Sequence, residues 1–178
     1  MKSLRVLLPL ALLSLSTAAL AQSDAQKSFD TLKTLAGDWE GPVTVVPPQP
    51  EMSDGKPLHI SLRVTSRGHA LVHEMQESGT PLDPTKYDHP ITMFYLDTDR
   101  LNLVHYCDVG NRPHMMAKKS DGKTLDFDLV DMTGPNDHGH MSHVLFTLVD
   151  PNHHIEDWTF TDPGGKPGTA RFDLHRMQ

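Results

Sequence analysis

The chain has 178 residues and a formal net charge of −7, with 16 Lys and Arg against 23 Asp and Glu. This acidic balance argues against binding to nucleic acid, which needs a basic face. The single cysteine, Cys107, excludes an internal disulfide, so the fold must be stabilised by its core. The length suits one domain with a substantial hydrophobic core.

The first 21 residues have the three parts of a secretory signal peptide. Lys2 and Arg5 give a positive start, residues 6–15 are almost wholly apolar, and Ala19-Leu20-Ala21 predicts cleavage after Ala21. The apolar run is shorter than the roughly 20 residues of a membrane-spanning helix, and no second run follows it. An uncleaved anchor is the alternative, which the cleavage motif argues against.

Export therefore predicts a periplasmic or secreted protein with no membrane attachment after cleavage. Residues 22–178 would form its single domain. Loss of Lys2 and Arg5 would take the formal net charge from −7 to −9.

A short helix is predicted over residues 24–35, because Phe29, Leu32 and Leu35 recur every three residues and Gly37 follows where helices end. After Gly37 the pattern changes to short apolar or alternating runs bounded by Gly, Pro, Asp or Asn, which are typical of strands. The predicted strands are 39–46, 58–66, 69–77, 91–97, 100–107, 113–119, 124–130, 141–149, 154–161 and 168–175.

The predicted fold class is all-β: an antiparallel meander of about ten strands closed into a barrel, preceded by the short helix. Connections as short as residues 66–68 and 120–122 make neighbouring strands antiparallel. Closure is favoured because free sheet edges invite aggregation, and a sandwich is the alternative. The longer segments 47–57, 79–90 and 133–139 are expected to be loops at the rim.

Three motifs carry a resemblance to a known family. Leu35-Ala36-Gly37-Asp38-Trp39-Glu40-Gly41 places a Gly-x-Trp at the start of the first strand, after a short helix. His105-Tyr106-Cys107 leads to Gly110-Asn111-Arg112-Pro113-His114-Met115, and Asp157-Trp158-Thr159 follows later. Together they resemble uncharacterised secreted bacterial lipocalin-like (calycin-type) β-barrel domains, over nearly all of residues 22–178.

The resemblance implies a lipocalin/calycin-like barrel more than it implies an activity. In the wider superfamily such barrels carry hydrophobic small molecules, and ten-stranded forms include fatty-acid carriers and haem-binding nitrobindin-like barrels. The resemblance makes Trp39 the aromatic plug at the closed end. It also implies an arginine paired with this tryptophan, for which Arg171 is the candidate.

His105 and Cys107 are the first candidates for a ligand site. They share a strand face with Leu101 and Leu103, so this face is expected to point inward. An inward His105 would orient a ligand or bind a metal or haem, whereas the alternative is a hydrogen-bonded core histidine beside a buried thiol. The predicted ligand-binding residues are Trp39, His105, Tyr106, Cys107, His143 and Trp158.

His138, His140 and His143 are the candidate metal ligands, because zinc sites take three or four His, Cys or carboxylate ligands. Their spacing weakens the prediction, since His140 and His143 point to opposite faces of a regular strand. The alternative is a solvated, histidine-rich rim. The sequence requires no cofactor; zinc and haem are the two that its histidines could hold.

No catalytic residue is predicted, which leaves enzyme activity undecided with binding favoured. His73-Glu74 begins like the zinc motif H-E-x-x-H, but Glu77 stands where the second histidine belongs. A G-x-S-x-G elbow and a glycine-rich phosphate loop are also missing. The leading hypothesis is an exported protein that binds a small hydrophobic molecule. The alternatives are a metal- or haem-dependent protein that uses the histidines, and a structural envelope protein with a filled barrel.

Overall fold

The computed structural model describes residues 22–48, 55–83, 85–118 and 120–178, so the predicted signal peptide lies outside the described residues. The elements are α1 (Asp24–Lys33), β1 (Gly37–Gly41), β2 (Val43–Val46), β3 (Leu58–Thr65), the 3-10 turn η2 (Ser66–Gly68), β4 (Ala70–Glu77), β5 (Ile91–Asp97), β6 (Arg100–Tyr106), β7 (Arg112–Ala117), β8 (Thr124–Thr133), β9 (His140–Asp150), β10 (His153–Thr161) and β11 (Pro167–Arg176). Within these ranges no helix is both long and apolar enough to cross a membrane.

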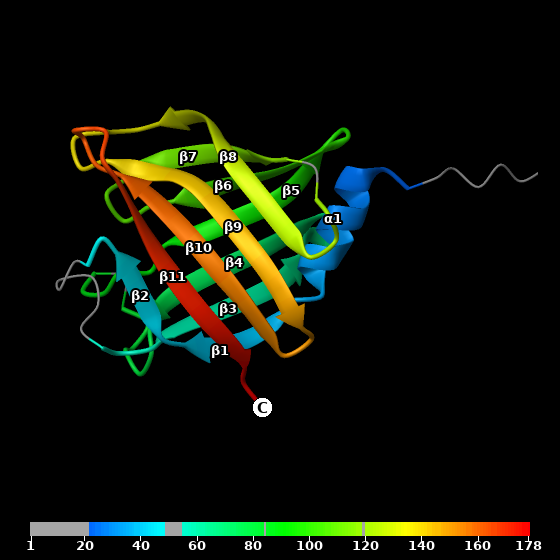
Figure 1. Ribbon diagram of the computed structural model, residues 1–178, viewed down its shortest axis with the longest axis horizontal. Coiled ribbons are helices and arrows are strands. Elements are labelled where there is room, and N and C mark those ends of the chain that lie inside the picture. Colours follow the sequence, from blue (N-terminus) through cyan, green and yellow to red (C-terminus); the bar gives the residue numbers. More distant parts are fainter. Residues whose placement is uncertain (1–21, 49–54, 84, 119) are drawn as a thin grey trace, which may run out of the picture.

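The strands form one antiparallel sheet that closes into a barrel (Figure 1). Each strand from β3 to β10 pairs with the next one along the chain, and β1 pairs with both β3 and β11. This gives a ten-stranded closed barrel, and β2 adds an eleventh strand along β11. The predicted fold class is confirmed, and the closed barrel is consistent with the lipocalin-like barrel that the resemblance implies.

The predicted strand 39–46 is instead two strands, β1 and β2, which separate at Pro42. β1 pairs with the end of β11 at His175 and Arg176, whereas β2 pairs with residues 169–172. Gly41 lies so close to β11 that a Cβ there would be 1.8 Å from the Asp173 carbonyl oxygen. The chain therefore changes its direction at a glycine and a proline, which lacks the N–H that a regular ladder needs.

The core fills the barrel with aromatic and aliphatic side chains. Phe29 and Leu32 of α1 are buried across one end of the barrel, beside β5 and β6. Further inside, the largest side chains are 0% exposed: Trp39, Phe94, Phe127, Phe146 and Trp158. Their rings pack edge to face, as Phe94 does against Phe127 and Phe146 at centroid distances of 5.6 and 5.7 Å.

Arg176 pairs with Trp39, so the expectation that Arg171 does so is wrong. The Arg176 guanidinium lies 4.1 Å from the Trp39 ring centroid and donates to the carbonyl oxygens of Ala36 at 2.7 Å and Thr34 at 3.1 Å. Arg171 lies five residues earlier on β11 and therefore on the opposite face, where it pairs with Asp157. Arg176 thus ties the segment after α1 to the last strand.

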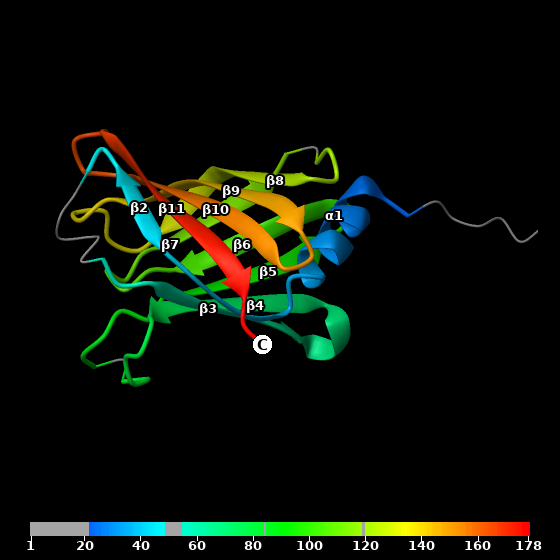
Figure 2. The same cartoon turned by 60° about the horizontal axis from the view of Figure 1, so that its bottom comes forward.

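The two ends of the barrel differ (Figures 1 and 2). One end carries α1 and the turns before β4, β6, β8 and β10. The opposite end carries the connections between β4 and β5, β6 and β7, β8 and β9, and β10 and β11. We call this second end the loop end.

Candidate functional site

A group of polar side chains lies inside the aromatic core. The buried polar cluster consists of His73 on β4, Thr92 on β5, His105 on β6, and His154 and Glu156 on β10. All five side chains are almost fully buried. Strand alternation places them there, because each lies on the same face as buried apolar neighbours of its strand. Buried charged groups of this kind need partners or a function.

Glu156 is the centre of the cluster. Its carboxylate accepts hydrogen bonds from His73 Nε2 at 3.0 Å, His154 Nε2 at 2.9 Å and Trp158 Nε1 at 2.8 Å. Burial alone would raise the pKa of Glu156, but the charges and hydrogen bonds of His73 and His154 outweigh burial and hold that pKa well below its ordinary value. Glu156 is therefore ionised inside the barrel.

His105 lies nearer the loop end and is neutral. Burial lowers its pKa to about 3, with a further contribution from His73. Its Nδ1 lies 2.8 Å from Thr92 Oγ1, and its ring lies 5.2 Å from the centroid of Trp158. The His73 ring lies 5.5 Å from the same indole, so both imidazoles are close to Trp158.

Four buried polar atoms of the described residues have no hydrogen-bond partner: His73 Nδ1, His105 Nε2, Asn111 Oδ1 and His154 Nδ1. Each histidine of the cluster thus uses one ring nitrogen and leaves the other free. Each unsatisfied buried polar atom lowers the stability of the fold by about 1–3 kcal/mol. A ligand that forms hydrogen bonds with such atoms would recover part of this loss. His105 and Asn111 are the two of these residues at the loop end.

Apolar side chains lie in the parts of the strands that approach the loop end. Leu58, Leu129 and Met141 are half-buried and pack against the core, and Met75 is buried in the core cluster. Long unbranched methionine side chains can change rotamer with little cost and fit varied apolar surfaces. The loop end therefore combines the buried polar group of His105 with an apolar rim, whose side chains can adopt other rotamers.

The structure places the predicted ligand-binding residues in three settings. Trp39, His105 and Trp158 are in the core, although Trp39 lies at the α1 end. Cys107 is half-buried, and burial raises the pKa of its thiol, which keeps it protonated. Tyr106 points outward and is 51% exposed.

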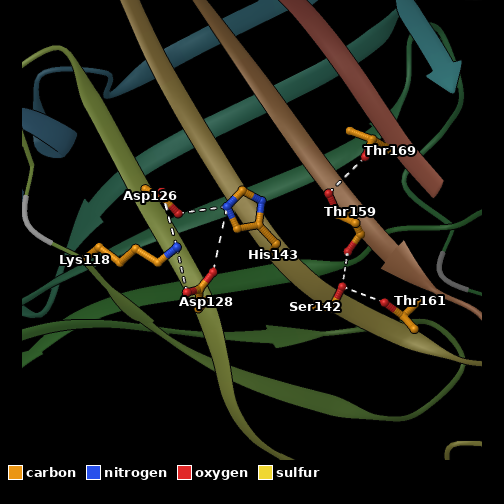
Figure 3. A network of polar contacts seen from close by, with 8 residues as sticks. All are labelled: Lys118, Asp126, Asp128, Ser142, His143, Thr159, Thr161 and Thr169. Atoms are coloured by element: carbon orange, nitrogen blue, oxygen red, sulfur yellow. Dashed lines mark hydrogen bonds and ion pairs between the residues drawn. The ribbon is translucent and has the colours of Figure 1, made fainter. Parts of the chain in front are cut away.

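His143 lies on the outer face of the barrel (Figure 3). Its Nε2 is 2.8 Å from Asp126 Oδ1 and 4.0 Å from Asp128 Oδ1. Lys118 pairs with both of these carboxylates, at 3.6 and 2.7 Å. Beside this group, Thr161 Oγ1 donates to Ser142 Oγ, which donates to the Thr159 carbonyl oxygen. The hydroxyl groups of Thr159 and Thr169 lie 3.0 Å apart across β10 and β11.

The histidines predicted as one metal site have separate partners. His138 lies on an exposed loop near Asp137, and His140 Nδ1 is 2.8 Å from Asn136 Oδ1. Two groups of three possible ligands come together among the described residues, each with its ligand atoms within 4.8 Å of one another. They are Asp126, Asp128 and His143, and His153, Asp173 and His175.

Sequence reasoning did not identify His73, His154, Glu156 or Thr92 as parts of a site. The signal was present in β10, where His154 and Glu156 alternate with Trp158 and therefore share its face. A carboxylate on the same face as a core tryptophan indicates a buried acid. His73 and Thr92 could not be added, because only closure of the barrel brings β4 and β5 opposite β10.

No protein-family model and no curated protein matches the chain. Its function must be argued from the chemistry of the buried polar cluster and from the barrel that holds it.

Proposed function

We propose that this chain is an exported, lipocalin-like binding protein that holds a small, neutral, hydroxyl-bearing apolar molecule at the loop end of its barrel. The observation that carries the proposal is the free Nε2 of His105, buried beside Trp158 beneath an apolar rim. A ligand site is typically apolar with a few placed polar groups, and this arrangement has both elements. The contact of Trp39 with Arg176 supports kinship with lipocalin-like barrels.

The ligand class follows from the charges of the cluster. His105 is neutral, and its Thr92 contact allows either ring tautomer, so a hydroxyl group suits it as both donor and acceptor. Neutral His105 offers no cation to pair with a carboxylate on the ligand, which would lose its hydration on entering the core without compensation. A neutral head group is therefore favoured over an acidic one.

The packing of the core limits the size of the ligand. Trp158 and Phe94 are 0% exposed, so the space for a ligand must open near the loop end. We place the opening at Met75 and Met141, near the loop end of β4 and β9, because flexible methionine side chains change rotamer at little cost. A short alkyl chain with one hydroxyl group fits these requirements.

Two-dimensional NMR tests the proposal with 1-octanol as the probe. Saturating addition should shift the indole N–H signal of Trp158, which lies beside His105, and leave that of Trp39 at the α1 end nearly unchanged. Octanoate, with the same chain and a charged head, should bind about tenfold more weakly, which corresponds to about 1.4 kcal/mol. His105→Phe should weaken octanol binding by a similar factor.

Tyr106→Phe is the matched control, because it changes a neighbouring residue on the outer face and should leave binding unaltered. Equal shifts of both tryptophans, or no saturable shift, would contradict the proposal and favour a structural role for a filled barrel. An absorption spectrum with a Soret band would favour the haem alternative instead. Export is tested separately by the intact mass of protein from its own host, which should begin at Gln22.

A further inference from the structure

A second group of histidines lies outside the barrel, near the start of β10 and the end of β11. His153 and His175 are direct partners in the antiparallel ladder, and Asp173 lies on the same face of β11, two residues before His175. Their side chains are partly or fully exposed to solvent, by 23% for His153, 47% for Asp173 and 66% for His175. Figure 1 shows β10 and β11 side by side, with the end of β11 near the C-terminus.

The three side chains converge on one point. Asp173 Oδ1 lies 2.7 Å from His153 Nε2 and 3.7 Å from His175 Nε2, and the two imidazole rings stack with centroids 4.4 Å apart. Tetrahedral ligands about 2.0–2.1 Å from a zinc ion stand about 3.3 Å apart from one another, which lies between the two separations from Asp173. Two imidazoles and one carboxylate also form a common set of protein ligands for zinc.

The surroundings of this group favour a cation. The strand partner of His153 on β9 is Asp150, and that of His175 on β1 is Glu40, so carboxylates stand on both sides. Arg171, the preceding outward residue of β11, is held by both oxygens of Asp157 at 2.7 and 2.8 Å. In the described part of the chain, the ion pairs of Asp173 are with its two histidines.

The other three-ligand group differs in this respect. Asp126, Asp128 and His143 already have a cation, because the Lys118 ammonium pairs with both carboxylates. The hydrogen bond that Lys118 donates to Asp128 raises the pKa of Lys118, so this ammonium stays charged. A metal ion would have to displace it.

We propose that His153, Asp173 and His175 form a surface site for a divalent transition metal of the zinc class. The imidazole Nε2 atoms and one Asp173 oxygen supply three ligands, and the solvent-exposed side leaves a coordination position for water or a further ligand. Imidazole ligands select zinc, copper, nickel and cobalt over magnesium and calcium. A bound ion would also link the first residue of β10 to the end of β11.

Zinc titration by isothermal calorimetry tests the site on the untagged chain that begins at Gln22. The wild-type protein should bind one Zn²⁺ at the site and no Mg²⁺, and Co²⁺ should give the visible absorption of a nitrogen-ligated ion. His153→Ala and His175→Ala should each weaken Zn²⁺ affinity by about 100-fold or more, and Asp173→Asn by at least about tenfold. Zn²⁺ should also raise the unfolding temperature of the wild type but not of the two histidine variants.

His143→Ala is the matched control, because it removes a histidine from the other acidic group and should keep the zinc site. Unfolding curves in the presence of EDTA establish that each variant is folded, which the outer-face position of all three residues favours. Unchanged affinity in His153→Ala and His175→Ala would overturn the proposal. Loss of zinc binding in His143→Ala alone would also overturn it and assign the metal to the Asp126 group.

Discussion

Glu156 shows how a single acidic residue is accommodated in an aromatic core. A buried carboxylate is costly unless donors replace the water that it loses. His73, His154 and Trp158 supply three such donors from two strands, so the charge is retained and its pKa is lowered despite full burial. The hydrogen bonds from His73 and His154 also fix the orientation of both imidazoles around the carboxylate.

Glu156→Leu should lower the free energy of unfolding by about 3–5 kcal/mol, because it leaves two imidazole donors and one indole donor unpaired inside the barrel. Glu156→Gln keeps the shape and one acceptor and should cost about 1–3 kcal/mol. Urea unfolding at neutral pH measures both. Asp157→Asn is the control, since Asp157 pairs on the outer face with the exposed Arg171, and it should cost less than about 1 kcal/mol. A loss below 1 kcal/mol for Glu156→Leu would mean that the cluster does not stabilise the fold.

Arg176 joins three elements of the fold. Besides Ala36 and Thr34, its guanidinium donates to the Pro151 carbonyl oxygen at 3.2 Å in the turn between β9 and β10. It thereby satisfies carbonyl groups beyond the end of α1 and covers the indole of Trp39. The helix is thus attached to the barrel through the last strand.

Arg176→Lys should lower the free energy of unfolding by about 1–2 kcal/mol, because an ammonium cannot reach three carbonyl oxygens and also stack on the indole. Hydrogen exchange should show the largest loss of protection in α1. Arg171→Lys changes an exposed pair on the same strand and should stay within about 1 kcal/mol of the wild type. Equal losses of stability in the two variants would show that the contacts of Arg176 stabilise the fold no more than the exposed Arg171–Asp157 pair does.

At the scale of the whole molecule, the buried cluster makes stability depend on pH. The pKa of His105 is about 3 in the folded protein against an ordinary 6.5, so between these values the unfolded chain binds a proton that the folded protein does not. Stability must therefore fall as the pH drops below 6.5. Glu156 acts in the same direction, because its lowered pKa stabilises the fold above the ordinary value of 4.5 and this contribution is lost below it.

His105→Phe should flatten the loss of stability between pH 6.5 and 4.5 by up to about 1.4 kcal/mol per pH unit, the value for one proton. Urea unfolding at a series of pH values measures the slope. His138→Phe removes an exposed loop histidine and should leave the slope as it is in the wild type. An unchanged slope in His105→Phe would show that this imidazole is protonated in the folded protein.

The sequence alone determined the all-β class, the antiparallel meander and nearly all strand positions, because hydrophobic alternation and turn residues are local signals. It also placed His105 inward, since its strand neighbours Leu101 and Leu103 are apolar. It did not reveal the break at Pro42, because the reason for that break is the close approach of Gly41 to β11. Nor did it identify Arg176 as the partner of Trp39.

Both candidate sites were decided by the tertiary structure. His73 and Glu156 are 83 residues apart in the chain, and His153 meets His175 only because β10 and β11 pair in that register. Alternation along one strand determines the face of the sheet to which a side chain points, whereas closure of the barrel determines which strands face each other across the core. The buried polar cluster comes together through that closure and the His153 group through the register of β10 and β11, so neither grouping could be read from local pattern.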